Sequence, residues 1–413
     1  MVLVLNKKYF ISKLYLFTLV FLVPLFDSAT GFLVRGESLS TGGLGTPSQL
    51  IRFFIVFLSI LIIQSKRVYS FLILTILYLF VVELAAFIFH QSFQGLLIGL
   101  VFSYKFIFPV FVFFALKKVF QNFDYTEQDI INIVFKSSLV LGICFLVGDL
   151  IAIRVGIASS FFRSSGLFSS GNGLGVLLGV FSLIILYGFE KKYLGKSMHK
   201  YSYYLILICL LFISTKASAI FLAINLFFLL IRLSLVYKIT IYSSITVILI
   251  AFYQPLVDLL NISFELVIWR YDNKTSWANF ILSAREDFIT DAMTSFNNTE
   301  FIIPRIIFGA GSFLSFESPS HFTLLYKMME MDSFDTFFMY GVIGVIVYLF
   351  VMYYCIKKAL FKSTILAFAT IAVFLHSIFA GHTMYDGLAV MAVVFILLLV
   401  QEKKQETELL GIV

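Results

Sequence analysis

Charged residues are scarce in this chain. They make up 13% of its 413 residues, whereas hydrophobic residues make up 61%, which is more apolar surface than a soluble core of this size could use. Strand-like alternation of apolar and polar residues is also lacking. Because backbone inside hydrocarbon must satisfy its own hydrogen bonds, the long apolar runs predict an all-α, polytopic integral membrane protein.

Cysteine and histidine are rare as well. The three cysteines, Cys144, Cys209 and Cys355, all fall inside apolar runs, which predicts buried apolar thiols rather than disulfides or metal ligands. No group of His, Asp and Glu has the spacing of a metal site. We therefore expect neither a metal nor a cofactor.

About twelve apolar runs have the length of roughly 20 residues that a membrane-crossing helix needs. The run at 201–214 is short and lies directly before the next, which predicts a tight hairpin or a re-entrant feature. The predicted spans are near residues 10–27, 50–64, 68–89, 95–116, 130–152, 171–189, 201–214, 217–236, 240–260, 336–356, 364–380 and 387–401.

Basic residues predict the orientation, because cytoplasmic loops retain Lys and Arg. With the amino terminus in the cytoplasm, nearly all basic connections fall on that side, so both termini are expected there. The net charge of +7 then reflects topology, and we expect no nucleic-acid partner. The residues behind this assignment are Lys7, Lys8, Lys66, Arg67, Lys117, Lys118, Lys191, Lys192, Lys196, Lys200, Lys238, Lys357, Lys358, Lys403 and Lys404.

The predicted organisation has three parts: helices in 1–260, one large outward loop at 261–335, and helices with a tail in 336–413. A connection of this length is usually functional or disordered, and the many apolar residues in the loop favour order. Within the loop, SWANFILSAREDFITDAM at 276–293 has the apolar spacing of an amphipathic helix at the membrane surface. Arg285 lies at the edge of its apolar face, which suits either snorkelling or anion binding.

The acidic stretch MEMDSFD at 329–335 opens the span at 336–356. Asp332 as the N-cap residue, with Asp335 at N3, would explain two of its three acids by capping alone. Acids fixed at a helix start are equally well placed for catalysis, and Glu330 lies just before them. Earlier in the loop, Gly309 and Gly311 allow a turn or a close approach to a ligand.

Four segments of the chain carry a family resemblance. FFRSSGLFSSGNGLG at 161–175 is similar to an R-x-x-G-x-F motif followed by an Asn-containing helix start. STKASAIF at 214–221 resembles a T-x-S-R motif, with Lys216 in the place of the arginine. The E-x-D-x-x-D block at 330–335 and AGHTMYD at 380–386 are the other two segments, and the loop before residue 330 also contains SAREDF, FGAGSF and His321. In this order, around one large outward loop, they resemble the O-antigen polymerases (Wzy type) of the O-antigen ligase and polymerase superfamily.

The resemblance implies a GT-C-like membrane glycosyltransferase in the bacterial inner membrane, with its loop in the periplasm. Such an enzyme transfers a growing glycan from undecaprenyl diphosphate to a lipid-linked repeat unit. Its expected partners are the undecaprenyl-diphosphate-linked oligosaccharide, membrane lipid and a chain-length regulator protein. An O-antigen ligase, which shares the topology, and a lipid-linked oligosaccharide flippase remain alternatives.

This chemistry needs cations on the leaving diphosphate and a base near the attacking hydroxyl. Arginine holds phosphate oxygens through its planar fork, so the outward arginines are candidates. The expected catalytic residues are Asp335, Glu330, Asp332 and His321, and the expected substrate-binding residues are Arg163, Arg285, Arg270, Arg305, Gly309, Gly311 and His382.

Overall fold

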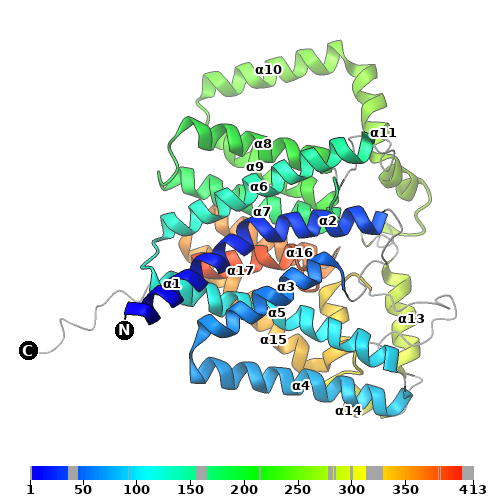
Figure 1. Cartoon of the computed structure of the whole chain (residues 1–413). Helices are drawn as coiled ribbons and strands as arrows, with labels where there is room; N and C mark the ends of the chain where they lie inside the picture. Colours follow the sequence, from blue (N-terminus) through cyan, green and yellow to red (C-terminus); the bar gives the residue numbers. More distant parts are fainter. Residues whose placement is uncertain are drawn as a thin grey trace, which may run out of the picture.

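The computed structural model describes residues 2–35, 45–91, 93–154, 165–213, 215–277, 282, 285–297, 301–312, 329–379, 381 and 383–401. Within these ranges every regular element is helical and no strand occurs, so the expected all-α fold is confirmed. Figure 1 shows most of the helices side by side in one bundle.

The first half of the chain contributes α1 (Val2–Phe17), a π-helical segment η1 (Thr18–Leu22), α2 (Val23–Arg35), α3 (Pro47–Ile63), α4 (Lys66–His90), α5 (Phe93–Asn122), α6 (Glu127–Arg154) and α7 (Gly171–Glu190). The second half contributes α8 (Ser197–Ile213), α9 (Lys216–Arg232), α10 (Leu235–Ala251), α11 (Tyr253–Asp272), α13 (Arg285–Asn297), α14 (Ile302–Phe308), α15 (Asp332–Lys362), α16 (Thr364–Phe379) and α17 (Ala389–Val400).

Six helical stretches of the described chain are long and apolar enough to cross a membrane: Lys8–Val34, Lys66–Ile88, Gly95–Asn122, Glu127–Ala152, Gly171–Glu190 and Asp332–Lys362. Four shorter helices, α3, α8, α16 and α17, are also apolar. These helices indicate a membrane-embedded protein. The count of twelve spans stays a prediction.

Helix α7 forms the centre of the bundle. Its residues from Gly173 to Gly188 are all buried, and it packs against α6, α8, α9, α16 and α17. A helix that is apolar all round belongs in an interior, and α7 carries no charge before Glu190. The surrounding helices expose apolar side chains on their outer faces, as expected of lipid-facing surfaces.

The connections rich in Lys lie at one end of the bundle. Figure 1 shows the start of α1, the α3–α4 connection and the α7–α8 connection together at this end, which we call the basic end. The acidic turn before α15 and the helices α13 and α14 lie toward the opposite end, here called the site end. That the site end faces outward remains the prediction drawn from the basic residues.

One predicted span is wrong as a single helix. The run at 240–260 is divided at Phe252, where α10 ends and α11 begins, and α11 then continues to Asp272, beyond the predicted loop boundary at 261. The cause is Pro255, which lies in the first turn of α11. Proline has no N–H to donate to the preceding turn, and in the first turn of a helix this missing donor costs no helical hydrogen bond.

Helix α15 is broken at Gly341, whose backbone has φ 64 and ψ −165. The break leaves the carbonyls of 338–340 without partners inside the helix. Ala310 N–H donates to the first at 2.9 Å, Gly311 N–H to the second at 3.1 Å, and the Tyr78 hydroxyl to the third at 2.8 Å. Irregular backbone at membrane depth is tolerated when protein groups satisfy it in this way.

Candidate functional site

The acidic turn at the start of α15 differs from the predicted cap. The N-cap position is Met331, whose side chain makes no capping hydrogen bond, so Asp332 is the first helical residue and Asp335 lies beyond N3. The predicted assignment of Asp332 as the cap is therefore wrong. Both carboxylates are fully buried and take other partners.

Asp335 holds the backbone on both sides of Glu330. Its Oδ1 accepts from Met329 N–H at 3.0 Å, and its Oδ2 accepts from Met331 N–H at 3.1 Å. Between them Glu330 has φ 61, a left-handed conformation that is uncommon for a residue with a side chain. Such backbone strain persists only where the surrounding contacts enforce it, and it is common at functional sites.

Asp332 connects α15 to the segment that follows α16. Its Oδ2 accepts from the Ser377 hydroxyl, from Thr383 N–H at 2.8 Å and from Met384 N–H at 3.0 Å. The buried Oδ1 has no hydrogen-bond partner among the described residues. Asp332 thus fixes the 383–386 segment at the site end.

Arg285 and Glu330 form an ion pair across 45 residues of sequence. Arg285 Nη2 lies 2.6 Å from Glu330 Oε2, and Nη1 donates to Leu282 O at 3.2 Å. Arg285 is 8% exposed, so it does not snorkel toward lipid headgroups. Its Nε is buried without a hydrogen bond within the described residues. The Glu330 side chain, by contrast, is 43% exposed.

Helix α13 carries Arg285 into this position. Ile289, Ala292 and Phe296, further along the same face, pack against Phe338 of α15 in a small second core. Figure 1 shows α13 running across the ends of α4 and α5 at the site end. The predicted amphipathic helix therefore has its buried face on protein. Of the apolar face predicted for it, Trp277 lies before α13 and is exposed.

The predicted glycine pair approaches backbone at the break in α15. A Cβ at Gly309 would lie 2.1 Å from Met339 O, and one at Gly311 would lie 3.0 Å from Glu83 Oε2. Both glycines have positive φ, at 91 and 74. The described contacts thus explain the pair by protein packing, and its role toward a substrate stays a prediction.

Glu83, inside the predicted span 68–89, is a buried carboxylate whose partner could not be predicted from the sequence. Its Oε1 accepts from both the N–H and the hydroxyl of Ser312, each at 3.0 Å, and so anchors the 309–312 segment to α4. Gly99 of α5 makes room for this carboxylate, because a Cβ there would lie 2.0 Å from Oε2.

The remaining predicted residues divide into two groups. Arg305 is buried in α14, and Arg270 lies in α11. Arg163, His321 and His382 lie outside the described residues. Their assignments stay predictions.

Three of the quoted motifs meet at the site end. Asp386, in the closing motif, lies against the start of α7, since a Cβ at Gly173 would be 2.3 Å from its Oδ2. Gly175 similarly faces Thr215, the N-cap residue of α9, which forms a reciprocal capping box with Ser218. Segments far apart in the chain are thereby joined to the segment that Asp332 holds.

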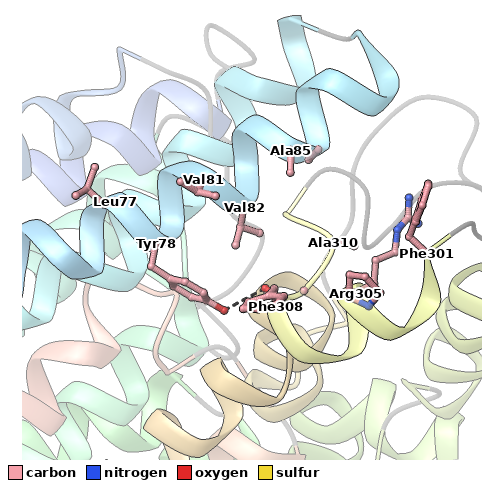
Figure 2. Close-up of a pocket in the computed structure, with 12 residues that line it drawn as sticks. Leu77, Tyr78, Val81, Val82, Ala85, Phe301, Arg305, Phe308 and Ala310 are labelled. Atoms are coloured by element: carbon pink, nitrogen blue, oxygen red, sulfur yellow. Dashed lines mark hydrogen bonds between the residues drawn. The ribbon is translucent and has the colours of Figure 1, made fainter.

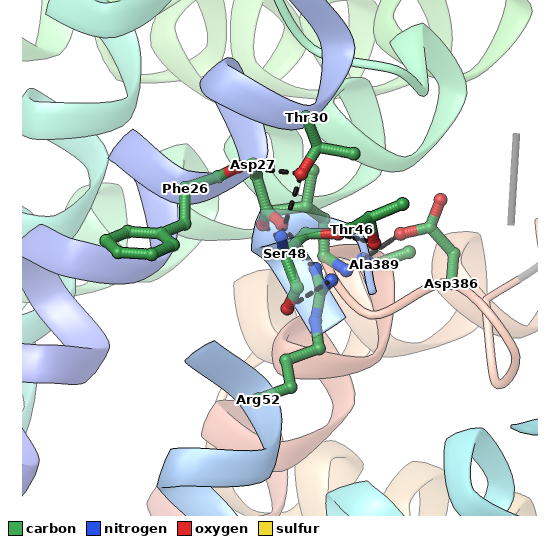
Figure 3. A network of polar contacts seen from close by, with 9 residues as sticks. Phe26, Asp27, Thr30, Thr46, Ser48, Arg52, Asp386 and Ala389 are labelled. Atoms are coloured by element: carbon green, nitrogen blue, oxygen red, sulfur yellow. Dashed lines mark hydrogen bonds and ion pairs between the residues drawn. The ribbon is translucent and has the colours of Figure 1, made fainter. Parts of the chain in front are cut away.

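A second polar cluster was not predicted. Arg52 Nη2 lies 2.9 Å from a carboxylate oxygen of Asp27, and Nη1 donates to Ser48 O at 3.2 Å (Figure 3). Both charged side chains are largely buried, at 13% and 4% exposed. Arg52 lies at the edge of a predicted span and Asp27 ends another, so nothing in the sequence pattern indicated that the two would pair.

Lys105 and Asp386 extend this cluster. Lys105 interacts electrostatically with Asp386 and stands 4.5 Å from the Phe102 ring. Gly387 lies against the Arg52 guanidinium, because a Cβ there would be 2.3 Å from Nε. Lys105 sits inside the predicted span 95–116, and an ionisable residue within a span is a functional candidate by default. The position of Lys105 inside a predicted span could therefore have indicated this cluster from the sequence.

At the site end a ligand can therefore reach the Arg285–Glu330 ion pair, whose carboxylate is partly exposed. The buried acids Asp335 and Asp332 hold the backbone around it. No group of three or more His, Cys, Asp or Glu that could hold a metal occurs in the described part of the chain. The fold and these buried charges define a helical membrane-embedded protein with a polar site at one end. No family model and no curated protein matches the chain.

Proposed function

We propose that this protein is a membrane glycosyltransferase of the O-antigen polymerase type, acting at the site end on polyprenyl-diphosphate-linked glycans. The observation that carries the proposal is the Arg285–Glu330 pair, which combines a buried guanidinium, an exposed carboxylate and an enforced left-handed backbone. The convergence of motifs from separate segments on the 383–386 segment adds support.

In the proposed reaction a sugar hydroxyl attacks the anomeric carbon of the glycan donor. The new glycosidic bond forms as the bond from that carbon to the lipid diphosphate breaks, and the diphosphate leaves with the bonding electrons. Arg285 binds the diphosphate and stabilises its developing charge. Glu330, released from Arg285 by the incoming anion, accepts the proton of the attacking hydroxyl.

Asp335 and Asp332 act as positioning residues in this proposal. Their carboxylates are fully buried and bonded to the protein's own N–H and hydroxyl groups, so they are not placed to meet a sugar. Asp335 keeps Glu330 in its conformation, and Asp332 holds the 383–386 segment. Rigid support of this kind is what a reacting group needs for accurate placement.

The test replaces each member of the pair in the host organism. Arg285→Ala and Glu330→Gln should each reduce long surface glycan by about 100-fold or more, the usual range for losing a general base or a charge-stabilising donor. Single-repeat product should accumulate while the protein stays in the membrane. Arg232→Ala is the matched control, because it breaks a 2.6 Å ion pair with Glu190 at the end of α7 nearer the basic end.

The glycan pattern also separates the alternatives. Normal chain length in both Arg285→Ala and Glu330→Gln would contradict the proposal. Complete loss of glycan-capped core would favour a ligase, and lipid-linked substrate retained on the inner leaflet would favour a flippase.

The proposal requires that the site end faces outward. In a cysteine-free background, Thr294→Cys on the exposed face of α13 should react with a membrane-impermeant thiol reagent added to intact cells. Gln121→Cys, exposed near the carboxyl end of α5, should react only after the membrane is opened. The reverse labelling pattern would place the site end in the cytoplasm, away from the outward-facing substrate, and would overturn the proposal.

A further inference from the structure

A groove runs along one side of α4 where α14 packs against it. Its volume is about 490 Å³, and apolar side chains dominate its walls. Leu77, Val81 and Ala85 of α4 form one wall, and Phe301 and Phe308 contribute to the other. Figure 2 shows Leu77 toward one end of the groove and Phe301, beside Arg305, toward the other.

The groove opens to the lipid-facing side of the bundle. Leu77, Val81 and Phe301 are between 51% and 59% exposed, and α4 is one of the six helices able to cross a membrane. An exposed apolar groove in a soluble protein would mark a binding surface. On a helix within the bilayer, the ligand that fits such walls is a hydrocarbon chain.

Arg305 gives the groove a polar end. It is the only ionisable residue among the described groove-lining residues other than the phenol of Tyr78, and it is 9% exposed. A cation at the end of an apolar groove complements a lipid whose headgroup is a phosphate or diphosphate. The groove therefore suits an anionic lipid that lays one hydrocarbon chain against its apolar walls.

The groove borders the candidate site directly. Ala86 and Ala310, which line it, belong to the same small core as Met329 and Phe338, on either side of the Glu330 turn. The Gly309–Ser312 segment, anchored by Glu83, forms part of the groove wall and also pairs with α15. The groove wall and the Glu330 turn therefore pack on one shared core, which joins the groove to the candidate site.

We propose that this groove binds the isoprenoid chain of a polyprenyl-diphosphate-linked substrate, with Arg305 toward the diphosphate. The proposal rests on the proposed function, because the adjacency to the Arg285–Glu330 site is what selects a polyprenyl carrier over a bilayer phospholipid. It adds a docking route for the lipid half of the substrate, separate from the residues that act on the sugar.

The test uses full-length protein in detergent or vesicles and a polyprenyl diphosphate that carries a photoreactive group in its chain. The cross-link should map to α4 and α14, and excess unlabelled polyprenyl diphosphate should abolish it while phosphatidylglycerol does not. Val81→Trp, which fills the groove, should reduce labelling by about tenfold, equivalent to about 1.4 kcal/mol of binding, and should raise KM more than it lowers kcat.

Leu74→Trp is the matched control, because Leu74 is also exposed on α4, at 66%, but does not line the groove. It should leave labelling and polymerisation unchanged. Arg305→Ala should weaken competition by the diphosphate more than competition by the corresponding uncharged polyprenol, and Arg305→Lys should restore part of the difference.

Two kinds of failure are distinguishable. Cross-links that map elsewhere, or equal competition by phosphatidylglycerol, would overturn the groove proposal even if Arg285→Ala still abolishes long glycan. Specific polyprenyl labelling of the groove together with normal glycan in Arg285→Ala would overturn the proposed function while leaving a lipid-binding groove.

Discussion

Among the described residues, two largely buried arginines, Arg52 and Arg285, each form an ion pair with a carboxylate, in different surroundings. Arg52 and Asp27 lie 2.9 Å apart with both side chains largely buried, at 13% and 4% exposed. Arg285 and Glu330 lie 2.6 Å apart, and there the acid is 43% exposed. The first pair is enclosed by the protein, and the second has one side open.

The difference in enclosure indicates a difference in role. The Arg52–Asp27 pair receives further contacts from Ser48 and lies against Gly387, on regular helices α2 and α3. The second pair depends on a residue with positive φ in an irregular turn. An enclosed pair fixes helices in place, whereas an open pair on strained backbone is available to a ligand.

The largest expected effect comes from breaking the enclosed pair. Arg52→Ala leaves the Asp27 carboxylate buried without its partner, which costs about 3–5 kcal/mol. The thermal unfolding midpoint in detergent and the amount of protein in the membrane should both fall, with Arg52→Lys restoring part of the loss. If Arg52→Ala unfolds like the unmodified protein but makes no long glycan, the enclosed pair is functional and the comparison fails.

A smaller effect is expected at Glu83, another buried acid. Glu83→Ala removes the acceptor for two donors of Ser312 and should destabilise the protein by about 1–3 kcal/mol. Glu83→Gln keeps an acceptor oxygen and should lose less. Thermal unfolding of the two variants measures the difference, and equal losses would show that Glu83 does not act through this anchor.

The smallest effect on stability is expected at Glu330, where two changes oppose each other. Glu330→Gly relieves the left-handed backbone, which favours the fold by about 1 kcal/mol, but it leaves the buried Arg285 guanidinium without this partner, so the net change should be small. The same variant should abolish polymerisation. An unfolding midpoint close to that of the unmodified protein, with lost activity, is the expected result, and a midpoint as low as that of Arg52→Ala would mean that Glu330 is structural, like Arg52.

The sequence predicted most of the helical content, and the site residues that it proposed stay predictions. The apolar runs located the buried helix α7 and the start of α15, and the spacing around Arg285 placed it on a helix near an apolar face. It could not pair Arg285 with Glu330, because the two residues are 45 positions apart and meet through the packing of α13 against α15.

Local rules gave the wrong answer at two points. The spacing of Asp332 and Asp335 predicts Asp332 as the cap, yet Met331 is the N-cap residue and Asp332 binds groups on α16 and after it, while Asp335 binds the N–H groups of Met329 and Met331. The run at 240–260 is apolar throughout, yet Pro255 divides it. In both cases the residue pattern was correct and a competing contact or a backbone restriction decided the structure.

The composition by itself determined that this chain is a set of apolar helices, because the backbone in hydrocarbon has few other ways to satisfy its hydrogen bonds. It also determined which end of each helix carries the lysines. Only the tertiary structure decided which buried charges meet. A charge inside an apolar bundle needs a partner, and the partner is whichever group the packing of distant helices brings within hydrogen-bond distance.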